Sequence, residues 1–412
     1  MTSSQHRQAE VLINGGGMIG LSLGVALAGA GVETVVLEKA DPAAILEAAF
    51  DGRVSAITHG SRQALTAIGL WDDIAPSAEA ILEIRVTDGD SPLFLHFDHR
   101  AVGDEPFGHI VENRHTRQAL YAAAEKQPRL QLIAPCRLRT LERGPAGVMA
   151  ELEDGRRIAA RVAVAADGRD SAWRRDAGIR VTSWAYAQTG IVCTVAHERP
   201  HRGVAQERFL AAGPFAILPM TDDPVHGHRS SLVWTERADL APSIMALGEA
   251  GFAAEMARRF GDYLGRLEVV GGRWSFPLGL SHATRYSDTR LVLVGDAAHA
   301  IHPISGQGLN LGLRDVAALA EVLVDARRLG LDIGAPDVID RYERWRRFDT
   351  AMLLAVTDGL NRLFSNDIAP IRLVRDLGLA AVNQAPPLKS FFMRHAMGAI
   401  GDLPRLARGE PL

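Results

Sequence analysis

The first forty residues alternate between short apolar runs and one glycine-rich segment. Residues 11–13 are apolar and are followed, after Asn14, by Gly15-x-Gly17-x-x-Gly20. Small apolar residues over 21–30 and a second apolar run over 35–37 come next. Short apolar runs that end in glycine are typical of buried strands, and a longer stretch of small apolar residues suits a helix packed on a sheet. The pattern therefore predicts strand, turn, helix and strand over residues 11–37.

Two later apolar runs also end in glycine and aspartate. The run over 162–166 ends in Asp167-Gly168, and the run over 291–294 ends in Gly295-Asp296. A long helical pattern then continues from Leu309 to about residue 329. Near-continuous apolar strands of this kind are found in parallel sheets that are covered on both faces. Three strand ends thus carry G-x-G-x-x-G, D-G and G-D, in that order.

The middle of the chain has a β-rich pattern. Segments rich in aromatic and β-branched residues occur at 189–198, 215–220, 231–236 and 269–278, which predicts a mostly antiparallel sheet with Cys193 in its core. FLHFDH at 94–99 follows the turn signal Asp88-Gly89-Asp90 and is expected to be the second strand of a hairpin. A helical part is expected from about residue 336.

Composition and charge narrow the class of protein. The chain has 412 residues, 47% of them hydrophobic and 23% charged, and a formal net charge of −4. These values are typical of a globular enzyme with two or three domains and give no indication of a nucleic-acid partner. Cys136 and Cys193 form no C-x-x-C motif, so neither a disulfide framework nor a thiolate metal site is expected. Residues 1–10 are polar, unlike a signal peptide, and we expect a cytoplasmic protein.

One segment is long and apolar enough to be confused with a membrane span. Residues 11–32 contain no charged side chain, but they hold seven glycines in the order of a dinucleotide-binding turn. We therefore interpret this segment as a buried strand, turn and helix.

The spacing of these glycines fits a dinucleotide. Gly15 permits a tight turn, Gly17 lets the backbone approach a pyrophosphate, and Gly20 lets helix and strand pack closely. The N-terminus of the following helix offers free N–H groups and a positive dipole to the phosphates. Glu38, 18 residues after Gly20, can accept hydrogen bonds from a ribose. Asn14 departs from the pattern, because the last strand residue is usually apolar, and its role stays open.

This ordered set of motifs resembles the flavin-dependent aromatic hydroxylases of the para-hydroxybenzoate hydroxylase type, and within them the ubiquinone-biosynthesis hydroxylase family. The resemblance covers nearly the whole chain. The segments that carry it include DGRVSAITHGSRQALTAIGLW (51–71), VENRHTRQAL (111–120), GDAAHAIHPISGQGLNLGLRD (295–315), YERWRRFD (342–349) and APPLKSFFMRHAMG (385–398).

The resemblance implies how FAD would be held. The first motif holds the ADP half, with Glu38 on the adenosine ribose, and Asp296 bonds the ribityl or ribose part. Asp167-Gly168 lies behind the pyrophosphate and contributes to FAD and pyridine-nucleotide binding. A loop over 303–310 passes the flavin ring, and N–H groups at the start of the next helix stabilise the negative charge of the reduced ring. The implied cofactor-binding residues are Gly15, Gly17, Gly20, Glu38, Lys39, Arg53, Arg114, Asp167, Gly168, Asp296, Pro303, Gly306, Gly308, Leu309 and Asn310.

Several of the polar residues leave alternatives open. Asp296, His299 and His302 have a conceivable metal-ligand spacing, but the surrounding glycines serve another purpose, and we expect no metal. We expect His299 to be a structural histidine, whereas His302 and Pro303 are candidates for shaping the pocket where oxygen meets substrate. Arg53 either lies beside the flavin, as the resemblance implies for Arg53 and Arg114, or forms an ordinary salt bridge.

The fold class expected is α/β, with three parts. A discontinuous Rossmann-like FAD-binding domain covers residues 1–80, 107–180 and 282–330. An inserted, mostly antiparallel β-sheet substrate domain covers 81–106 and 181–281, and a helical C-terminal region covers 331–412.

The activity implied by the resemblance is hydroxylation of the aromatic ring of a polyprenyl phenol or quinol in ubiquinone biosynthesis, through a flavin C4a-hydroperoxide. NAD(P)H is the implied reductant and would bind transiently, because the sequence holds no second G-x-G-x-x-G. One alternative is a hydroxylase or epoxidase of another aromatic or polyketide-like substrate, for which Arg208 or Arg229 could supply a cationic clamp. Another alternative is a non-catalytic flavoprotein scaffold of a biosynthetic complex.

The C-terminal part differs from the rest of the chain in charge. Residues 341–412 contain ten Arg and one Lys against seven Asp or Glu, an excess of four positive charges. Such a basic region either contacts a membrane surface or other ubiquinone-biosynthesis proteins, or is simply a solvated helix face. A polyprenylated substrate would suit a peripheral position at the inner face of the membrane.

Overall fold

The three motif-bearing strands lie next to one another in a parallel sheet. We describe a computed structural model in which residues 6–47, 52–89, 91, 94–301, 306–364, 383–385, 387, 389–390, 393–394, 397–398 and 401–412 are placed. The six strands of this sheet, in spatial order, are β19 (Ser287–Asp288), β20 (Leu291–Leu293), β13 (Val162–Ala165), β2 (Val11–Asn14), β3 (Thr34–Leu37) and β9 (Leu130–Ile133). All neighbouring pairs from β20 to β9 are parallel, and only β19 pairs antiparallel. The carboxyl ends of β20, β13 and β2 therefore meet at one edge.

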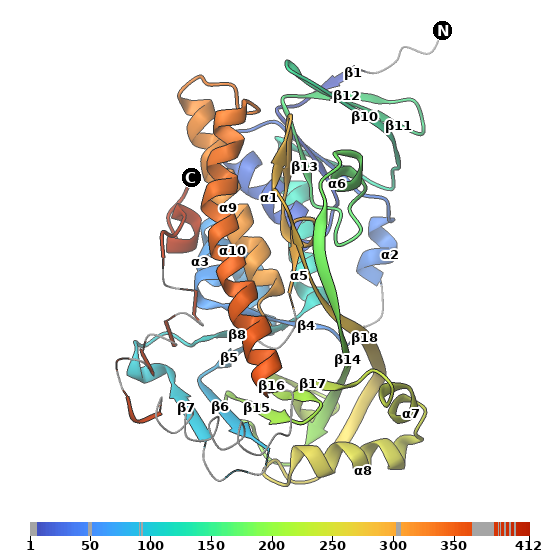
Figure 1. Cartoon of the computed structure of the whole chain (residues 1–412), viewed down its shortest axis with the longest axis vertical. Helices are drawn as coiled ribbons and strands as arrows, with labels where there is room; N and C mark the ends of the chain where they lie inside the picture. Colours follow the sequence, from blue (N-terminus) through green and yellow to red (C-terminus); the bar gives the residue numbers. More distant parts are fainter. Residues whose placement is uncertain are drawn as a thin grey trace.

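Helices and a small sheet cover the two faces of this parallel sheet (Figure 1). Helix α1 (Met18–Gly29) packs between α5 (Asn113–Lys126) and α9 (Gly308–Arg328). The antiparallel strands β10 (Leu138–Gly144), β11 (Gly147–Leu152) and β12 (Arg157–Ala160) share one hydrophobic core with the parallel strands, and β1 (His6–Gln8) extends their sheet. The prediction of a buried strand, turn and helix over residues 11–32 is confirmed.

A second, eight-stranded sheet lies mostly in the lower half of the molecule in Figure 1, and its strands β14 and β18 reach into the upper half. It is antiparallel except where β15 pairs with β6. Its strands, in spatial order, are β21 (His299–Ala300), β18 (Leu267–Ala283), β14 (Val181–His197), β17 (Gly227–Arg237), β16 (Gly213–Asp223), β15 (Val204–Leu210), β6 (Glu83–Asp88) and β7 (Phe94–Asp98). The long strands β14 and β18 connect the two halves. The expected hairpin is confirmed, because β6 and β7 pair antiparallel.

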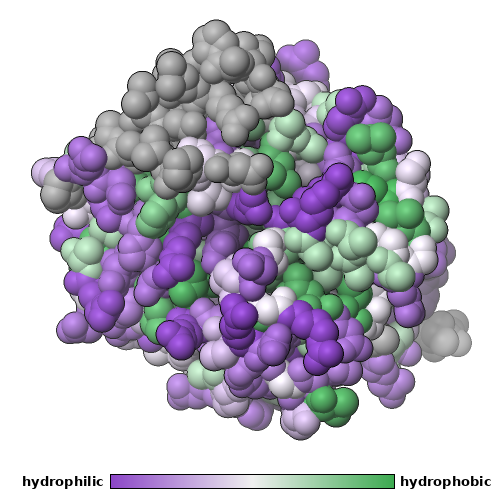
Figure 2. All heavy atoms as spheres, turned by 90° about the horizontal axis from the view of Figure 1, so that it is seen from below, coloured by the Kyte–Doolittle hydropathy of each residue, from purple (hydrophilic) through white to green (hydrophobic). Residues whose placement is uncertain are grey.

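One face of the large sheet is closed by helices. Helices α7 (Ala241–Met245) and α8 (Glu249–Phe260) cover a core that contains Cys193, Phe215 and Trp234, each fully buried. The expectation of a core cysteine at position 193 is confirmed. Figure 2 shows this end of the molecule from below, where hydrophilic side chains predominate and hydrophobic ones form smaller separate areas.

A three-stranded sheet and a long helix complete the fold. Strands β4 (Val54–Thr58), β8 (Gly108–Glu112) and β5 (Ala78–Ile81) form an antiparallel sheet. Helix α10 (Pro336–Phe364) packs on α9. The remaining elements are α2 (Pro42–Glu47), α3 (His59–Ala67), α4 (Trp71–Ile74), α6 (Ala172–Asp176) and the 3-10 turns at 75–77, 99–101, 295–297 and 405–408.

The expected fold class is confirmed: an α/β fold with a Rossmann-like sheet, an inserted, mostly antiparallel sheet and a C-terminal helical part. The residue boundaries of the three domains stay a prediction. Among the placed residues, none of the helices combines the length and apolar character that crossing a membrane requires.

Candidate cofactor and substrate site

Of the three motif glycines in the turn after β2, two are closely packed and one is open. A Cβ on Gly15, whose φ is +112°, would lie 2.3 Å from the Ala166 carbonyl oxygen, and a Cβ on Gly20 would lie 1.9 Å from the Gly15 oxygen. A Cβ on Gly17 would meet no atom within 4 Å. The turn is thus tight where it contacts the protein and open at the N-terminus of α1, where phosphate oxygens can approach free N–H groups.

Glu38 follows β3 and faces the same turn. Its Oε2 accepts a hydrogen bond from the Gly16 N–H at 2.7 Å, and its Oε1 accepts one from the Ala40 N–H at 2.8 Å. Each carboxylate oxygen has lone pairs left for further donors. The side chain of the next residue, Lys39, is exposed. The structure therefore brings Glu38 to the glycine turn, and its role on a ribose stays a prediction.

Asp167 ends β13 and is held by Asn14 at the end of the adjacent strand. The Asn14 Nδ2 donates to Asp167 Oδ2 at 3.2 Å, and the Ala172 N–H donates to the same oxygen at 2.9 Å. Asp167 Oδ1 is buried and has no hydrogen-bond partner among the placed residues. Gly168 continues with a φ of +86°. Asn14, whose role was open from the sequence alone, thus orients the carboxylate of Asp167.

Asp296 follows β20, the third of the adjacent strands whose carboxyl ends carry the motifs. Its side chain is exposed to solvent, yet the protein around it desolvates the carboxyl enough to raise its pKa above the ordinary value. Within the described parts of the chain, no hydrogen bond to its carboxylate is formed. A carboxylate that is accessible in a partly desolvated position can accept hydrogen bonds from the hydroxyl groups of a ligand.

A buried ionic network supports the Asp296 loop. Asp315 Oδ2 accepts from the Gly295 N–H at 3.0 Å and lies 2.6 Å from His299 Nε2, while Arg346 Nε donates to Asp315 Oδ1 at 2.8 Å. Arg346 also pairs with Asp349 at 2.6 Å. Burial alone would raise the pKa of Asp315, but His299 and Arg346 hold it below its ordinary value. The expectation that His299 is a satisfied structural histidine is confirmed.

The second half of the site joins β4, β8 and α9. Asn310 is fully buried, and its Oδ1 accepts from the Thr58 N–H at 3.0 Å while its Nδ2 donates to the Ala56 oxygen at 2.7 Å. Gly306 lies close by, since its Cβ would be 3.2 Å from that of Ala56. The N-cap residue Gln307 makes no side-chain cap, so the N–H groups that begin α9, at Gly308, Leu309 and Asn310, have no intrahelical acceptor.

Arg53 and Arg114 lie near each other at the start of β4 and the end of β8. Val54 pairs with Glu112, and the Arg53 oxygen accepts from the Asn113 N–H at 3.1 Å. Arg114 pairs with the buried Glu112 at 2.7 Å. The exposed Arg53 guanidinium lies 6.0 Å from the Phe276 ring. The two arginines are thus brought together, and their contact with a flavin stays a prediction.

The candidate pocket residues His302 and Pro303 lie outside the described residues. Among the residues that are described, no group of three or more His, Cys, Asp or Glu side chains is arranged to hold a metal ion.

These residues fit FAD. The open N-terminus of α1, the unpaired Oδ1 of Asp167 and the accessible carboxylate of Asp296 lie along one edge of the parallel sheet. They supply donors for phosphates and acceptors for sugar hydroxyls in the positions that a dinucleotide needs at the carboxyl ends of parallel strands. The uncapped start of α9 adds N–H groups and a positive dipole for an electron-rich ring edge.

We expect an Asp296→Ala variant to retain less FAD on purification, with at least about a tenfold loss of affinity, because a charged acceptor for sugar hydroxyls is removed. The measurement is the ratio of flavin to protein absorbance and the dissociation constant after FAD is added back. An Asp170→Ala variant, altered at an exposed residue of the neighbouring loop, is the control. A fully yellow Asp296→Ala protein with normal affinity would contradict the assigned role.

The other face of the large sheet forms an apolar floor next to this site. Val192, Val233 and Ala216 are paired across adjacent strands and keep partial exposure, while their neighbours on the α8 side are buried. Two arginines considered as a clamp for an aromatic acid are otherwise engaged: Arg208 donates to the Arg259 oxygen at 2.8 Å, and Arg229 pairs with Glu112 at 3.2 Å. This arrangement favours an uncharged substrate.

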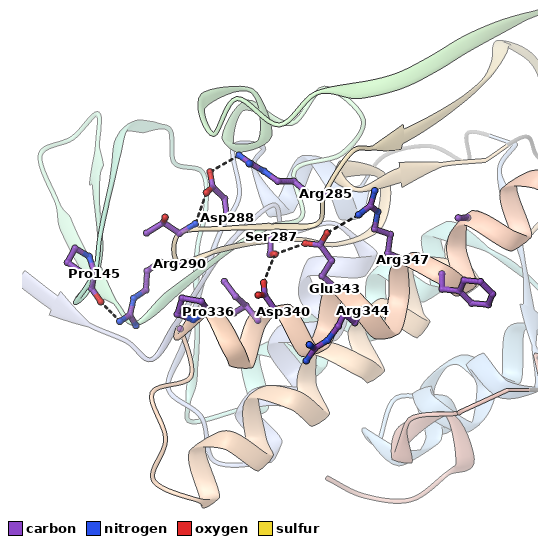
Figure 3. A pocket seen from close by; sticks show the side chains of 15 residues that line it. Pro145, Arg285, Ser287, Asp288, Arg290, Pro336, Asp340, Glu343, Arg344 and Arg347 are labelled. Carbon is purple, nitrogen blue, oxygen red and sulfur yellow. Dashed lines mark hydrogen bonds and ion pairs between the residues drawn. The ribbon is translucent and has the colours of Figure 1, made fainter.

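A groove of about 940 Å³ lies elsewhere, between the β19 turn and α10 (Figure 3). Ser287 Oγ donates to Glu343 Oε2 at 2.6 Å, Arg347 pairs with Glu343 at 3.6 Å, and Arg285 pairs with Asp288 at 3.2 Å. The groove opens at the amino end of β20, opposite the motif-bearing strand ends and away from the predicted cofactor site.

Sequence reasoning missed several residues that support the site. Asn14 holds Asp167, and Asp315 with Arg346 holds the loop of Asp296. Arg174 donates to the Ala297 oxygen at 2.9 Å and the Arg169 oxygen at 2.7 Å, and so ties the second motif to the third. Asn14 stands out in the sequence as a polar residue at the end of an apolar strand, whereas Arg174, Asp315 and Arg346 each lie next to other charged residues and have no such signal.

Known proteins are similar to this chain over nearly its whole length. A family model described as an FAD binding domain matches residues 8–354. The ubiquinone hydroxylase UbiL of Rhodospirillum rubrum is 53% identical over 415 residues, covering 100% of this chain and 95% of that protein. The 3-demethoxyubiquinol 3-hydroxylase of Escherichia coli is 35% identical, covering 95% of this chain and 99% of that protein. Among solved structures, p-nitrophenol 4-monooxygenase from Pseudomonas putida shares the fold, with a TM-score of 0.77 at 21% identity over 95% of this chain and 97% of that one.

Proposed function

Because this chain belongs to the FAD-binding-domain family of flavoprotein monooxygenases, we propose that it hydroxylates the aromatic ring of a polyprenylated phenol or quinol in ubiquinone biosynthesis. The observation that carries the proposal is the 53% identity to a ubiquinone hydroxylase over the full chain. The substrates are then the polyprenylated aromatic ring and molecular oxygen, with NAD(P)H as the transient reductant.

The residues of this chain bind the cofactor, orient it and keep water away. When bound, FAD supplies the reaction with oxygen that transfers one oxygen atom to the ring. The edge formed by Gly17, Glu38, Asp167 and Asp296 holds the dinucleotide, and the N–H groups that begin α9 stabilise negative charge on the flavin. The apolar floor of Val192, Val233 and Ala216 receives an uncharged ring and excludes water from it.

The paired state of Arg208 and Arg229 supports the prenylated substrate over a small aromatic acid. A benzoate-like substrate needs a free cation beside its carboxylate, because a desolvated, unpaired charge is costly. Arg208 donates to the Arg259 oxygen and Arg229 binds the buried Glu112. Freeing Arg229 would leave Glu112, which is 4% exposed, with one counter-ion fewer.

Contact with a membrane surface or with other ubiquinone-biosynthesis proteins stays a prediction, as does a cytoplasmic, peripheral location. Contact with a membrane surface or a partner protein is supported by helix α10. This helix exposes Phe348 (73%), Met352 (50%) and Val356 (44%) at four-residue intervals. Residues four apart lie on one helix face, so these side chains form an apolar stripe.

The proposal is tested by complementation. The gene is placed in bacterial strains that each lack one ring hydroxylase of ubiquinone synthesis, and the accumulated intermediates are identified by mass. We expect ubiquinone to be restored in at least one strain, with loss of the intermediate that precedes that hydroxylation. Failure in every strain, together with bound flavin that no donor reduces, would contradict the enzyme function.

A further inference from the structure

Strand β15 places the side chain of Glu207 on the face of the large sheet opposite α8. This face is turned toward the part of the molecule that contains the parallel sheet, which we call the cofactor half. Arg208 points to the other face, where it donates to the Arg259 oxygen of α8. Phe209 points to the cofactor half, with its ring centroid 4.2 Å from that of Phe364 in α10. Successive side chains of a strand alternate between faces, so Glu207 shares the face of Phe209.

From Glu207, a row of residues paired across adjacent strands crosses the sheet toward the predicted flavin site. It pairs in register with Ala216, which continues through Val233 and Val192 to Trp274. Trp274 packs on Gly52, where a Cβ would lie 2.2 Å from the ring. Gly52 directly precedes Arg53, one of the residues expected beside the flavin. The row is thus the apolar floor, with a carboxyl group at its far end.

The surroundings of this carboxyl group are apolar. Its neighbours on the same face are Ala205, Phe209, Val86 and Ala216, and its Oε1 is buried with no hydrogen-bond partner among the described residues. The residue as a whole keeps partial exposure. Burial raises the pKa of Glu207 to about 8, and no charged side chain in the described parts of the chain contributes to this shift. A buried polar group without a partner calls for an explanation, and a ligand is one.

We propose that the Glu207 carboxyl is a substrate-binding group that hydrogen-bonds to an oxygen substituent on the ring of a phenolic substrate lying on the apolar floor. The inference rests on the proposed function. Glu207 would supply a hydrogen bond to the substrate that the apolar side chains of the floor cannot form. A protonated carboxyl offers one donor and also an acceptor, so it can bind a hydroxyl or an ether oxygen.

This contact has a consequence for pH. A ring that covers Glu207 removes the carboxyl further from water, which favours its protonated form. Binding therefore raises its pKa further, so affinity is highest below about pH 8 and falls as the pH rises through the pKa of the free enzyme. Val86, Ala205, Ala216 and Phe209, which face the carboxyl from β6, β15 and β16, do not titrate.

The test measures binding of a phenol with one ortho prenyl unit to the FAD-loaded enzyme, followed by the change in flavin absorbance between about pH 7 and pH 9. Glu207→Leu should raise the dissociation constant about tenfold, because the hydrogen bond is lost. Glu207→Gln keeps hydrogen-bonding groups, so it should bind within a few fold of the unaltered enzyme, without the loss of affinity above pH 8. Gln206→Leu changes the adjacent residue, which points to the α8 face, and should behave like the unaltered enzyme.

The outcomes separate this inference from the proposed function. Equal dissociation constants in Glu207→Leu and the unaltered enzyme, or an unchanged pH dependence in Glu207→Gln, would overturn the role of Glu207 alone. No binding of the phenol to the unaltered enzyme would overturn the proposed function, and this inference with it. If Glu207→Leu does not fold with FAD, the pH profile of Glu207→Gln decides.

Discussion

A Gly20→Ala variant should lose its FAD and at least about 2 kcal/mol of unfolding free energy, because the added methyl group has no space. Its Cβ would lie 1.9 Å from the Gly15 oxygen, a backbone atom that cannot move without displacing the glycine turn. The displaced turn would no longer present the N-terminus of α1 to the pyrophosphate. Denaturant unfolding and the ratio of flavin to protein measure the two losses.

Gly29→Ala in the same helix is the matched control. A Cβ on Gly29 would meet no atom within 4 Å. Alanine has the higher helix propensity, so this variant should keep its FAD and be as stable as the unaltered protein, or more stable by up to about 1 kcal/mol. If Gly20→Ala behaved like Gly29→Ala, the close packing at the first motif would be refuted.

An Asp315→Ala variant should be destabilised by about 3 kcal/mol or more and should also bind FAD more weakly. Removing one partner of a buried ion pair leaves the other charge uncompensated. Here the buried Arg346 and His299 both lose the carboxylate, and the Gly295 N–H that precedes Asp296 loses its acceptor. Thermal or denaturant unfolding of the FAD-free proteins separates the loss of stability from the loss of cofactor.

The control for Asp315→Ala lies further along the same helix. Asp325 forms an ion pair with Arg405 near the surface, where its side chain keeps 30% exposure. Pairs of this kind contribute little, so Asp325→Ala should change the unfolding free energy by less than about 1 kcal/mol. Equal stability of the two variants would show that the buried network does not support the third motif.

The sequence predicted those parts of the site that depend on local pattern. Gly15, Gly20 and Glu38 could be placed because a strand, a turn and a helix follow one another within thirty residues, and each step has its own spacing. Asp167 and Asp296 could be placed because each lies within two residues of the end of an apolar run. Their alignment at one edge then follows from the parallel order of β20, β13 and β2.

The contacts that the sequence did not predict join residues far apart in the chain. Asn14 and Asp167 are 153 positions apart, and Asp315 meets Arg346 across two helices. Nothing in the local pattern around Asn14 or Asp315 specifies the partner. The same holds for Glu207: three consecutive polar residues, 206–208, do not show which face of the strand is covered by α8 and which is turned to the cofactor half.

Labelled dioxygen shows whether the chain hydroxylates a prenylated aromatic ring with FAD. The FAD-loaded protein is supplied with NADH or NADPH, a prenylated phenol and isotopically labelled dioxygen, and the product is analysed by mass. We expect the product ring to have gained one labelled oxygen atom, with none derived from water. Oxidation of the nicotinamide that yields hydrogen peroxide and leaves the ring unchanged, with every ring-hydroxylase substrate of the pathway, would contradict the proposed function.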